Sequence, residues 1–240
     1  MNNHKFLIII TCFLLFQTCK EESLMSFSEI NITTENNTLV DINIPKASGN
    51  ESIANAINSE ISNIIIQELN IGDTNDSTSL TIEESINSFN REYLAFIDEF
   101  PESNQAWEAL IDGDVIFQSE NIITISLTSY INTGGAHGIL QISLLNFDAV
   151  SGHRIPNQNL FNNQEAFTNL AKTFFDNTVE DKTLLFDPDN FKLPANMGYS
   201  DDGLLLLYNV YEIAPYVTGI IDFTIPYEKI EAYLVFDSSR

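Results

Sequence analysis

The chain has 240 residues, and its 34 acidic side chains against 10 basic ones give a formal net charge of −24 at pH 7. This length suffices for one large domain or two small ones with a substantial core. The charge argues against nucleic acid as a partner, because so acidic a chain repels phosphate backbones. A strongly acidic surface instead favours cationic partners and speeds their arrival, although acidity also serves to keep exported proteins soluble.

The first nineteen residues resemble a lipoprotein signal peptide. Lys5 precedes an apolar run of eleven residues, Phe6–Phe16, which is too short to span a bilayer, where ~20 are needed, and suits the h-region of a secretory signal. A small residue and then Cys19 follow, as in the lipobox at which lipoprotein signal peptidase cuts. We therefore expect residues 1–18 to be removed and Cys19 to carry the lipid that attaches the chain to a membrane. A secretory signal with an idle cysteine nearby is the alternative.

The residues after the cysteine resemble a localisation signal. The segment Lys20–Glu22, one lysine and two glutamates, resembles the export tag that sends some Gram-negative lipoproteins to the outer face of the outer membrane. An ordinary charged tether has the same composition. We expect an outer-membrane lipoprotein displayed at the cell surface, with residues 19–29 as its tether. Cys12 leaves with the signal, so the single remaining thiol permits no intramolecular disulfide and the core must provide the stability.

The first half of the chain predicts a strand, two helices and a group of strands. Residues 38–44 alternate apolar and polar side chains up to Pro45, which indicates a strand. Helical spacing over residues 50–71, with Asn50 as a suitable N-cap, predicts the first helix. A second amphipathic helix, beginning with a Thr-x-x-Glu capping-box motif, is predicted over residues 81–100. An antiparallel meander of three or four strands is then predicted over residues 107–112, 114–118, 122–130 and 138–147.

The second half predicts a further mixed unit. Its expected elements are a helix, a short strand, a buried central strand, another strand and a short helix, over residues 163–177, near 191, 204–210, 219–225 and 227–233. The predicted fold class is therefore α+β, with two α+β subdomains that each pack helices on a mainly antiparallel sheet. The first is expected to cover residues 30–148 and the second residues 149–238.

Residues that could carry chemistry are few. Only His137 and His153 remain after loss of the signal, whereas a catalytic zinc usually takes three protein ligands. No CxxC, HExxH or GxSxG motif occurs, so we expect no catalytic residue, metal or cofactor. Carboxylates are too abundant to single out a pair, and a glycosidase-like pair stays open. Residues 73–84 space their oxygens like an EF-hand loop but have Thr78 where glycine is needed; calcium there stays open against a plain polar connection between helices.

Two loop-forming segments are the strongest candidates for a binding site. In the first, Gly134 and Gly135 permit positive φ, so an irregular connection between strands is expected, and His137 either touches a ligand or fixes the loop. In the second, Pro215 and Gly219 break a strand and force a turn whose aromatic side chains either form a binding rim or cap the core. The candidate partner-binding residues are Gly134, Gly135, His137, Tyr211, Glu212, Pro215 and Tyr216.

These segments also carry a family resemblance. The motifs at Thr133–Gly138, Tyr208–Gly219 and Ile225–Tyr227 resemble those of a family that includes the extracellular, lysozyme-binding region of the anti-sigma factor RsiV and the non-catalytic region of the peptidoglycan deacetylase PdaC. The resemblance extends from about Ile30 to Leu234 and implies a two-domain α+β fold with no catalytic residue attached to it. The sigma-binding segment and transmembrane helix of RsiV, and the deacetylase domain of PdaC with its zinc histidines, have no counterpart in the sequence.

The sequence thus favours a lipid-anchored, non-enzymatic envelope module that binds a partner. The resemblance implies a cationic protein such as lysozyme or a cell-wall glycan (peptidoglycan), and the charge favours the protein. Two alternatives belong to other classes. One is an envelope hydrolase that uses carboxylates near the Gly134–His137 loop together with Glu212, and the other is a purely structural envelope lipoprotein.

Overall fold

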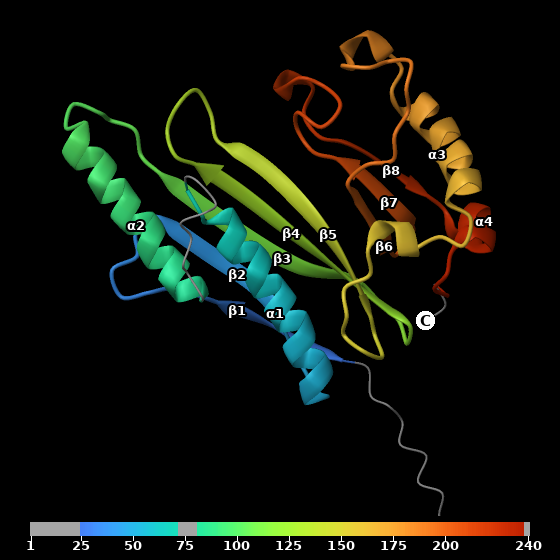
Figure 1. Ribbon diagram of the computed structural model, residues 1–240, viewed down its shortest axis with the longest axis horizontal. Helices are drawn as coiled ribbons and strands as arrows, with labels where there is room; N and C mark the ends of the chain where they lie inside the picture. Colours follow the sequence, from blue (N-terminus) through green and yellow to red (C-terminus); the bar gives the residue numbers. More distant parts are fainter. Residues whose placement is uncertain (1–24, 72–80, 238–240) are drawn as a thin grey trace, which may run out of the picture.

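The computed structural model describes residues 25–71 and 81–237 (Figure 1). The expected signal peptide and the lipid-carrying Cys19 lie outside the described residues, as does the larger part of the EF-hand-like segment, residues 73–80. None of the helices in the described part of the chain has the length and apolar character that crossing a bilayer requires.

Five strands form the first sheet, and their order in space is their order in the chain. They are β1 (Ser26–Asn31), β2 (Val40–Ser48), β3 (Glu108–Gln118), β4 (Ile122–Asn132) and β5 (Ile139–Asp148). Strands β2 and β3 are parallel, and the other neighbours are antiparallel. A parallel pair needs a long crossover, which is supplied by α1 (Glu51–Glu68) and α2 (Ile82–Glu99). Both helices cover the same face of the sheet (Figure 1).

Local side-chain hydrogen bonds set the starts of these two helices. The Asn50 side chain accepts hydrogen bonds from the backbone N–H groups of Ser52 and Ile53. At α2, Thr81 Oγ1 accepts from the Glu84 N–H and the Glu84 carboxylate accepts from the Thr81 N–H, so the predicted capping box is confirmed. The helices and the sheet enclose a first core that includes Ile42, Ile57, Ile61, Ile65, Ile86, Phe89, Ile111 and Ile125.

The tether was predicted to extend to residue 29, but residues 26–29 belong to β1, which pairs with β2 along its whole length. The two apolar side chains of β1, Phe27 and Ile30, are half-buried and pack against the first core. A short edge strand with only two apolar side chains has too weak a pattern to be found from the sequence, because its hydrogen bonds come from a partner strand.

Two further strand boundaries differ from the prediction. Pro45 does not end β2, because beyond Asn43 this strand pairs with β1 alone, and proline is tolerated where one side of a strand lacks a neighbour. The two strands predicted over residues 107–112 and 114–118 are one strand, β3, with a bulge between Val115 and Phe117.

The second domain is a three-stranded antiparallel sheet with helices packed on it. Its strands are β6 (Asn196–Ser200), β7 (Gly203–Tyr208) and β8 (Ile221–Ile225), and its helices are α3 (Gln164–Thr178) and the short α4 (Tyr227–Ile230). Four 3₁₀ turns complete it: η1 (Asn157–Asn159), η2 (Lys182–Leu184), η3 (Tyr216–Thr218) and η4 (Glu231–Tyr233). The central, buried position predicted for the apolar run is confirmed, since β7 lies between β6 and β8.

The strand predicted near Phe191 is absent, and β6 begins at Asn196 instead. Phe191 packs on Phe175 of α3, with ring centroids 5.1 Å apart. The next residue is held by a side chain, because Tyr208 Oη donates a 2.6 Å hydrogen bond to the Lys192 carbonyl oxygen. Phe191 is therefore apolar because it packs on a helix from a loop, and its apolar character was mistaken for that of a strand residue.

The two domains share a tightly packed interface. Strand β6 lies on the sheet face opposite α1 and α2, where a Cβ at Gly198 would come within 2.8 Å of the Thr124 side chain and 3.3 Å of Leu144 Cβ. The far end of the β3–β4 hairpin reaches into the second core, to which it contributes Phe117 and Ile122. The α+β class with two subdomains, each built on a mainly antiparallel sheet, is confirmed.

Candidate functional site

The structure brings the two candidate segments together, although about seventy residues separate them in the chain. The rings of His137 and Tyr216 stack with centroids 3.7 Å apart and planes 14° from parallel. Tyr216 Oη donates a 3.3 Å hydrogen bond to the Gly138 carbonyl oxygen, and His137 Nδ1 lies 3.0 Å from the same oxygen. One carbonyl group thus ties the loop of the first domain to the turn of the second.

The loop between β4 and β5 depends on its glycines. Gly134 and Gly135 both have φ of +93°, a region open to glycine and rarely adopted by other residues. The space that a Cβ would occupy at Gly134 is filled by the Gln105 side chain. At Gly138 a Cβ would lie 2.5 Å from the ring of Tyr130. The irregular connection predicted from the paired glycines is confirmed, and the close approach explains Gly138 as well.

The turn between β7 and β8 carries the other candidate residues and is strained. Tyr211 has φ of +67°, a conformation that costs a non-glycine residue about 1–3 kcal/mol and persists where its surroundings enforce it. The side chain of Tyr211 is 52% exposed, and its ring centroid lies 5.6 Å from that of Tyr216. Pro215 precedes the 3₁₀ turn η3, as its fixed φ allows.

The Glu212 side chain stabilises this turn through hydrogen bonds to the backbone. One carboxylate oxygen accepts a 2.7 Å hydrogen bond from the Ala195 N–H, and the other accepts a 2.9 Å bond from the Asn209 N–H. Both oxygens are therefore engaged by backbone donors, and the side chain joins the start of the turn to the segment before β6. Glu212 thereby supports the turn that carries Tyr211 and Tyr216.

Asparagine side chains attach the second domain to the free edge of β5. Asn209 Nδ2 donates to the Ile142 carbonyl oxygen at 2.8 Å, and its Oδ1 accepts from the Ile142 N–H at 2.9 Å. Asn196 Oδ1 accepts from the Leu144 N–H at 3.0 Å, and Asn146 Nδ2 donates to the Met197 carbonyl at 2.7 Å. The amides of Asn209 and Asn196 bond to backbone groups of an edge strand as a neighbouring strand would, and Asn146 of β5 bonds to β6, so the candidate site is held by contacts between the two domains.

A row of apolar side chains crosses the first sheet next to the loop that carries His137. Leu110, Tyr130 and Leu140 lie opposite one another on β3, β4 and β5. They alternate with core residues, so they face away from α1 and α2, and Leu110 and Leu140 are each 36% exposed. We define the junction surface as Leu110, Tyr130, His137, Leu140, Tyr211, Tyr216 and Val217, the last being 91% exposed.

Acidic residues lie around this surface. Asp41 is opposite Leu110 on the neighbouring strand β2. Glu108 and Asp112 flank Leu110 along β3, and both are exposed on the same face. Sequence reasoning missed Leu110, Tyr130 and Leu140, because only the strand register places them beside one another. Ala109, Leu110 and Ile111 are consecutive apolar residues in β3, so an apolar side chain on the face away from the core was the signal that could have found the row.

The remaining candidates for chemistry stay apart. His137 and His153 lie beyond opposite ends of β5, a ten-residue strand, so they are about 30 Å apart at about 3.3 Å per residue. Within residues 25–71 and 81–237, no group of three or more His, Cys, Asp or Glu side chains is placed to hold a metal ion.

Comparison with known proteins divides the chain into the same two parts. The family model described as "Deacetylase PdaC" matches residues 32–140, and the model described as "Protein of unknown function (DUF3298)" matches residues 155–228. None of the curated proteins matches the chain.

Two solved structures of the DUF3298 family have the same fold. The protein from Bacteroides fragilis NCTC 9343 has a TM-score of 0.68 at 20% identity, over 90% of this chain and 96% of that one. The protein from Pseudomonas aeruginosa PAO1 has a TM-score of 0.60 at 18% identity, over 89% and 95% of the two chains. The family resemblance seen in the sequence is confirmed, and the chain belongs to the two-domain PdaC/DUF3298-type family.

Proposed function

We propose that this chain is a lipid-anchored, non-enzymatic envelope protein that binds a cationic protein of the lysozyme type through the junction surface. The observation that carries the proposal is the stacking of His137 on Tyr216. This contact joins the exposed row of the first domain and the strained turn of the second into one apolar surface.

The chemistry of the junction surface supports a protein partner. Its exposed tyrosine side chain, Tyr211, is of a kind that often dominates binding energy at interfaces, and the exposed aliphatic side chains add apolar area around it. The carboxylates of Asp41, Glu108 and Asp112 lie beside them. With 34 acidic against 10 basic residues, the protein attracts a basic partner from a distance and speeds the encounter.

The N-terminal motifs and the family resemblance supply the setting. The lipobox-like sequence at Cys19 would place the lipid on the first residue of the mature chain, and Lys20–Glu22 would direct it to the outer face of the outer membrane. The resemblance to the lysozyme-binding region of RsiV makes lysozyme the cationic protein to test first. A cell-wall glycan is the competing ligand.

A binding role fits the candidate residues better than a hydrolytic one. The hydrolase alternative needs Glu212 as a reacting group, and both of its oxygens accept backbone hydrogen bonds. The first domain matches a model named for a deacetylase, but the sequence offers no motif for that reaction.

Surface plasmon resonance with immobilised protein tests the proposal. Residues 20–240 are suitable, because they keep every residue that the structure describes. Lysozyme should bind at low ionic strength and more weakly at about 0.15 M salt, where charges farther apart than about 8 Å are screened. Peptidoglycan fragments serve as the competing ligand. Absence of lysozyme binding at low ionic strength, or binding of the fragments alone, would contradict the proposal.

Two variants locate the binding surface. Val217→Ser removes an exposed apolar side chain from the junction surface, and Tyr211→Ala removes an exposed aromatic one. Each should weaken lysozyme binding about tenfold, which corresponds to about 1.4 kcal/mol. Val150→Ser is the matched control, since Val150 is also exposed and lies in the turn beyond the other end of β5. Equal affinity of Val217→Ser and Val150→Ser would place the partner on another surface.

A further inference from the structure

A pocket in the DUF3298 domain is a second candidate site, and it shares the turn between β7 and β8 with the junction surface. It has a volume of about 210 Å³ and is formed by α3, η2, the loop that follows η2 and residues of that turn. Three of the chain's ten basic residues, Lys172, Lys182 and Lys192, line it. In a protein with so few cations, this concentration within one pocket sets the site apart from the rest of the surface.

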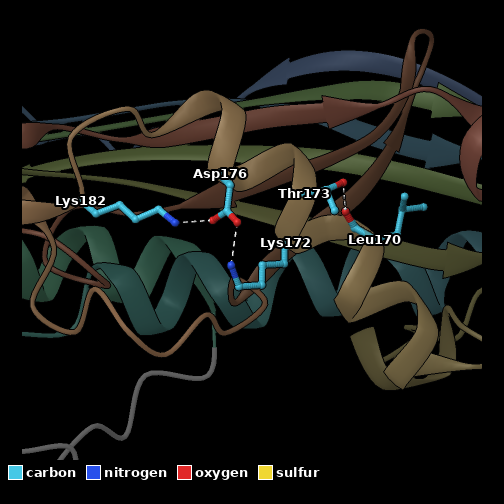
Figure 2. Close-up of polar contacts among 5 residues, drawn as sticks. All are labelled: Leu170, Lys172, Thr173, Asp176 and Lys182. Carbon is cyan, nitrogen blue, oxygen red and sulfur yellow. Dashed lines mark hydrogen bonds and ion pairs between the residues drawn. The ribbon is translucent and has the colours of Figure 1, made fainter.

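Two of these lysines are fixed by one carboxylate. One carboxylate oxygen of Asp176 accepts a 2.6 Å hydrogen bond from Lys172 Nζ, and the other accepts a 2.6 Å hydrogen bond from Lys182 Nζ (Figure 2). The hydrogen bonds from the two ammonium groups lower the pKa of Asp176 below its ordinary value. Each ammonium has three donors and uses one here, so the cluster keeps a charge of +1 and donors for a further acceptor.

Two opposite charges in the same pocket have no partner within the described part of the chain. Lys192 and Asp189 both line the pocket, yet neither side chain forms a hydrogen bond or an ion pair with another residue that the structure describes. The neighbouring Asp187 differs, because Asn190 Nδ2 donates to both of its oxygens at 3.0 Å. The pocket thus offers one lysine and one aspartate whose side chains have no hydrogen-bond partner among the described residues. Asp187 and Glu212, which also line it, accept hydrogen bonds only from neutral donors.

Four aromatic side chains, Phe175, Phe186, Phe191 and Tyr208, also line the pocket. Phe175 of α3 contacts Phe191 at 5.1 Å and Tyr208 at 5.6 Å between ring centroids. Phe186, in the loop after η2, is 60% exposed, so its ring is open to a ligand in the pocket. These rings would bury an apolar side chain of a ligand.

We propose that this pocket binds a small zwitterionic ligand, an amino acid or dipeptide with an apolar side chain. The ligand carboxylate would meet Lys192 and the lysines held by Asp176, its ammonium group would meet Asp189, and its apolar side chain would lie against Phe175 and Phe186. The volume of about 210 Å³ is below the ~300–1,000 Å³ of drug-sized sites. A ligand without net charge also avoids the long-range repulsion that this acidic protein exerts on anions.

Titration with defined dipeptides, followed by amide chemical shifts of residues 20–240, tests the proposal. Alanyl-phenylalanine is the probe, and its N-acetylated and C-amidated forms each lack one of the two charges. The free dipeptide should shift the signals of the pocket residues, and each capped form should bind at least about tenfold more weakly. An N-acetylated form that binds as tightly as the free dipeptide would overturn the zwitterion, because the site would then recognise an anion. Absence of shifts with every form would overturn the site.

Variants with a matched control make the test specific. Lys192→Met and Asp189→Asn should each weaken the free dipeptide about tenfold, and Phe186→Ala should weaken it by removing the aromatic contact. Lys229→Met removes the same charge from an exposed position outside the pocket and should leave affinity unchanged. Equal losses in Lys192→Met and Lys229→Met would show a general charge effect and refute the assignment. Lysozyme binding should be unaffected by Phe186→Ala, so this site and the junction surface are tested independently.

Discussion

Asn209 provides the sharpest test of how the two domains are held together. Its amide forms two hydrogen bonds with one residue of the β5 edge, donating to the Ile142 carbonyl at 2.8 Å and accepting from the Ile142 N–H at 2.9 Å. Asn209→Ala removes both bonds and leaves the two backbone groups of Ile142 without these partners. The side chain is half-buried, so water can replace the bonds only in part.

The expected loss follows from these two bonds. Each contributes about 0.5–1.5 kcal/mol net, so Asn209→Ala should lower the free energy of unfolding by about 2 kcal/mol. With a urea m-value of about 1–3 kcal/mol per M, the midpoint of unfolding should fall by about 1 M. Asn209→Asp keeps the acceptor for the Ile142 N–H but sets an oxygen against the carbonyl, so it should not restore the wild-type midpoint.

Urea unfolding monitored by two probes measures this loss. Trp107 is the only tryptophan of the chain and is buried in the first core, so its fluorescence reports the first domain. Far-ultraviolet circular dichroism reports both domains. Asn63→Ala is the control, because Asn63 is exposed on α1 and alanine favours a helix at least as well as asparagine. A midpoint for Asn209→Ala equal to that of the control would refute the argument that the amide holds the domains together.

Three further outcomes follow from the same contacts. Glu212→Gln should lower stability by about 2 kcal/mol, since a neutral amide cannot accept from both backbone N–H groups of Ala195 and Asn209; thermal unfolding measures this, and an unchanged Tm would contradict the structural role. Burial raises the pKa of Tyr199 and of Tyr208 well above the ordinary value of 10.0. The folded state then holds protons that the unfolded state releases, so the free energy of unfolding should be unchanged below pH 10 and should fall as the pH rises above it. An alkaline absorbance titration in which all eight tyrosines ionise together, without unfolding, would contradict this. Gly138→Ala should lower the free energy of unfolding by about 1–3 kcal/mol, because the added methyl group would meet the Tyr130 ring at 2.5 Å. A urea midpoint equal to that of the wild type would contradict this, since it would mean that the ring moves aside at no cost.

Elements with local signals could be predicted from the sequence. The N-cap at Asn50 and the capping box at Thr81 and Glu84 are side-chain contacts within one turn of helix, so residues three apart in the chain identify them. The buried β7 could be found for a related reason, since a strand covered on both faces is apolar throughout its length.

Features that depend on distant partners could not be predicted. The parallel pairing of β2 with β3 brings together residues separated by two helices. The continuity of β3 through Gly113 has a cause in its neighbours, because a Cβ there would meet the side chains of Leu127 and Pro45 at 2.8 Å. Glycine in this position permits close packing inside a strand, whereas in the sequence it has the appearance of a turn.

The candidate site could be predicted only in part from the sequence, for the same reason. Glycines and aromatic residues in two motifs identified His137 and Tyr216, but the row of Leu110, Tyr130 and Leu140 requires the sheet register. Glu212 was a candidate for partner binding, and its hydrogen bonds show that it supports the turn. The pocket lined by Lys172, Lys182 and Lys192, here called the lysine pocket, did have a signal in the sequence, since three of the ten basic residues fall within positions 172–192.

The turn over residues 209–219 connects the two proposed sites. Its strain at Tyr211, about 1–3 kcal/mol, is offset by the bonds of Asn209 and Glu212 and by a 2.9 Å hydrogen bond from the Phe186 N–H to the Ile213 carbonyl. Rigid presentation lowers the entropic cost of binding, so Tyr211 and Val217 are held ready for a partner. Glu212 and Ile213 of the same turn line the lysine pocket. A substitution that loosens the turn, such as Glu212→Gln, should therefore weaken both ligands, whereas Val217→Ser and Lys192→Met should each weaken one.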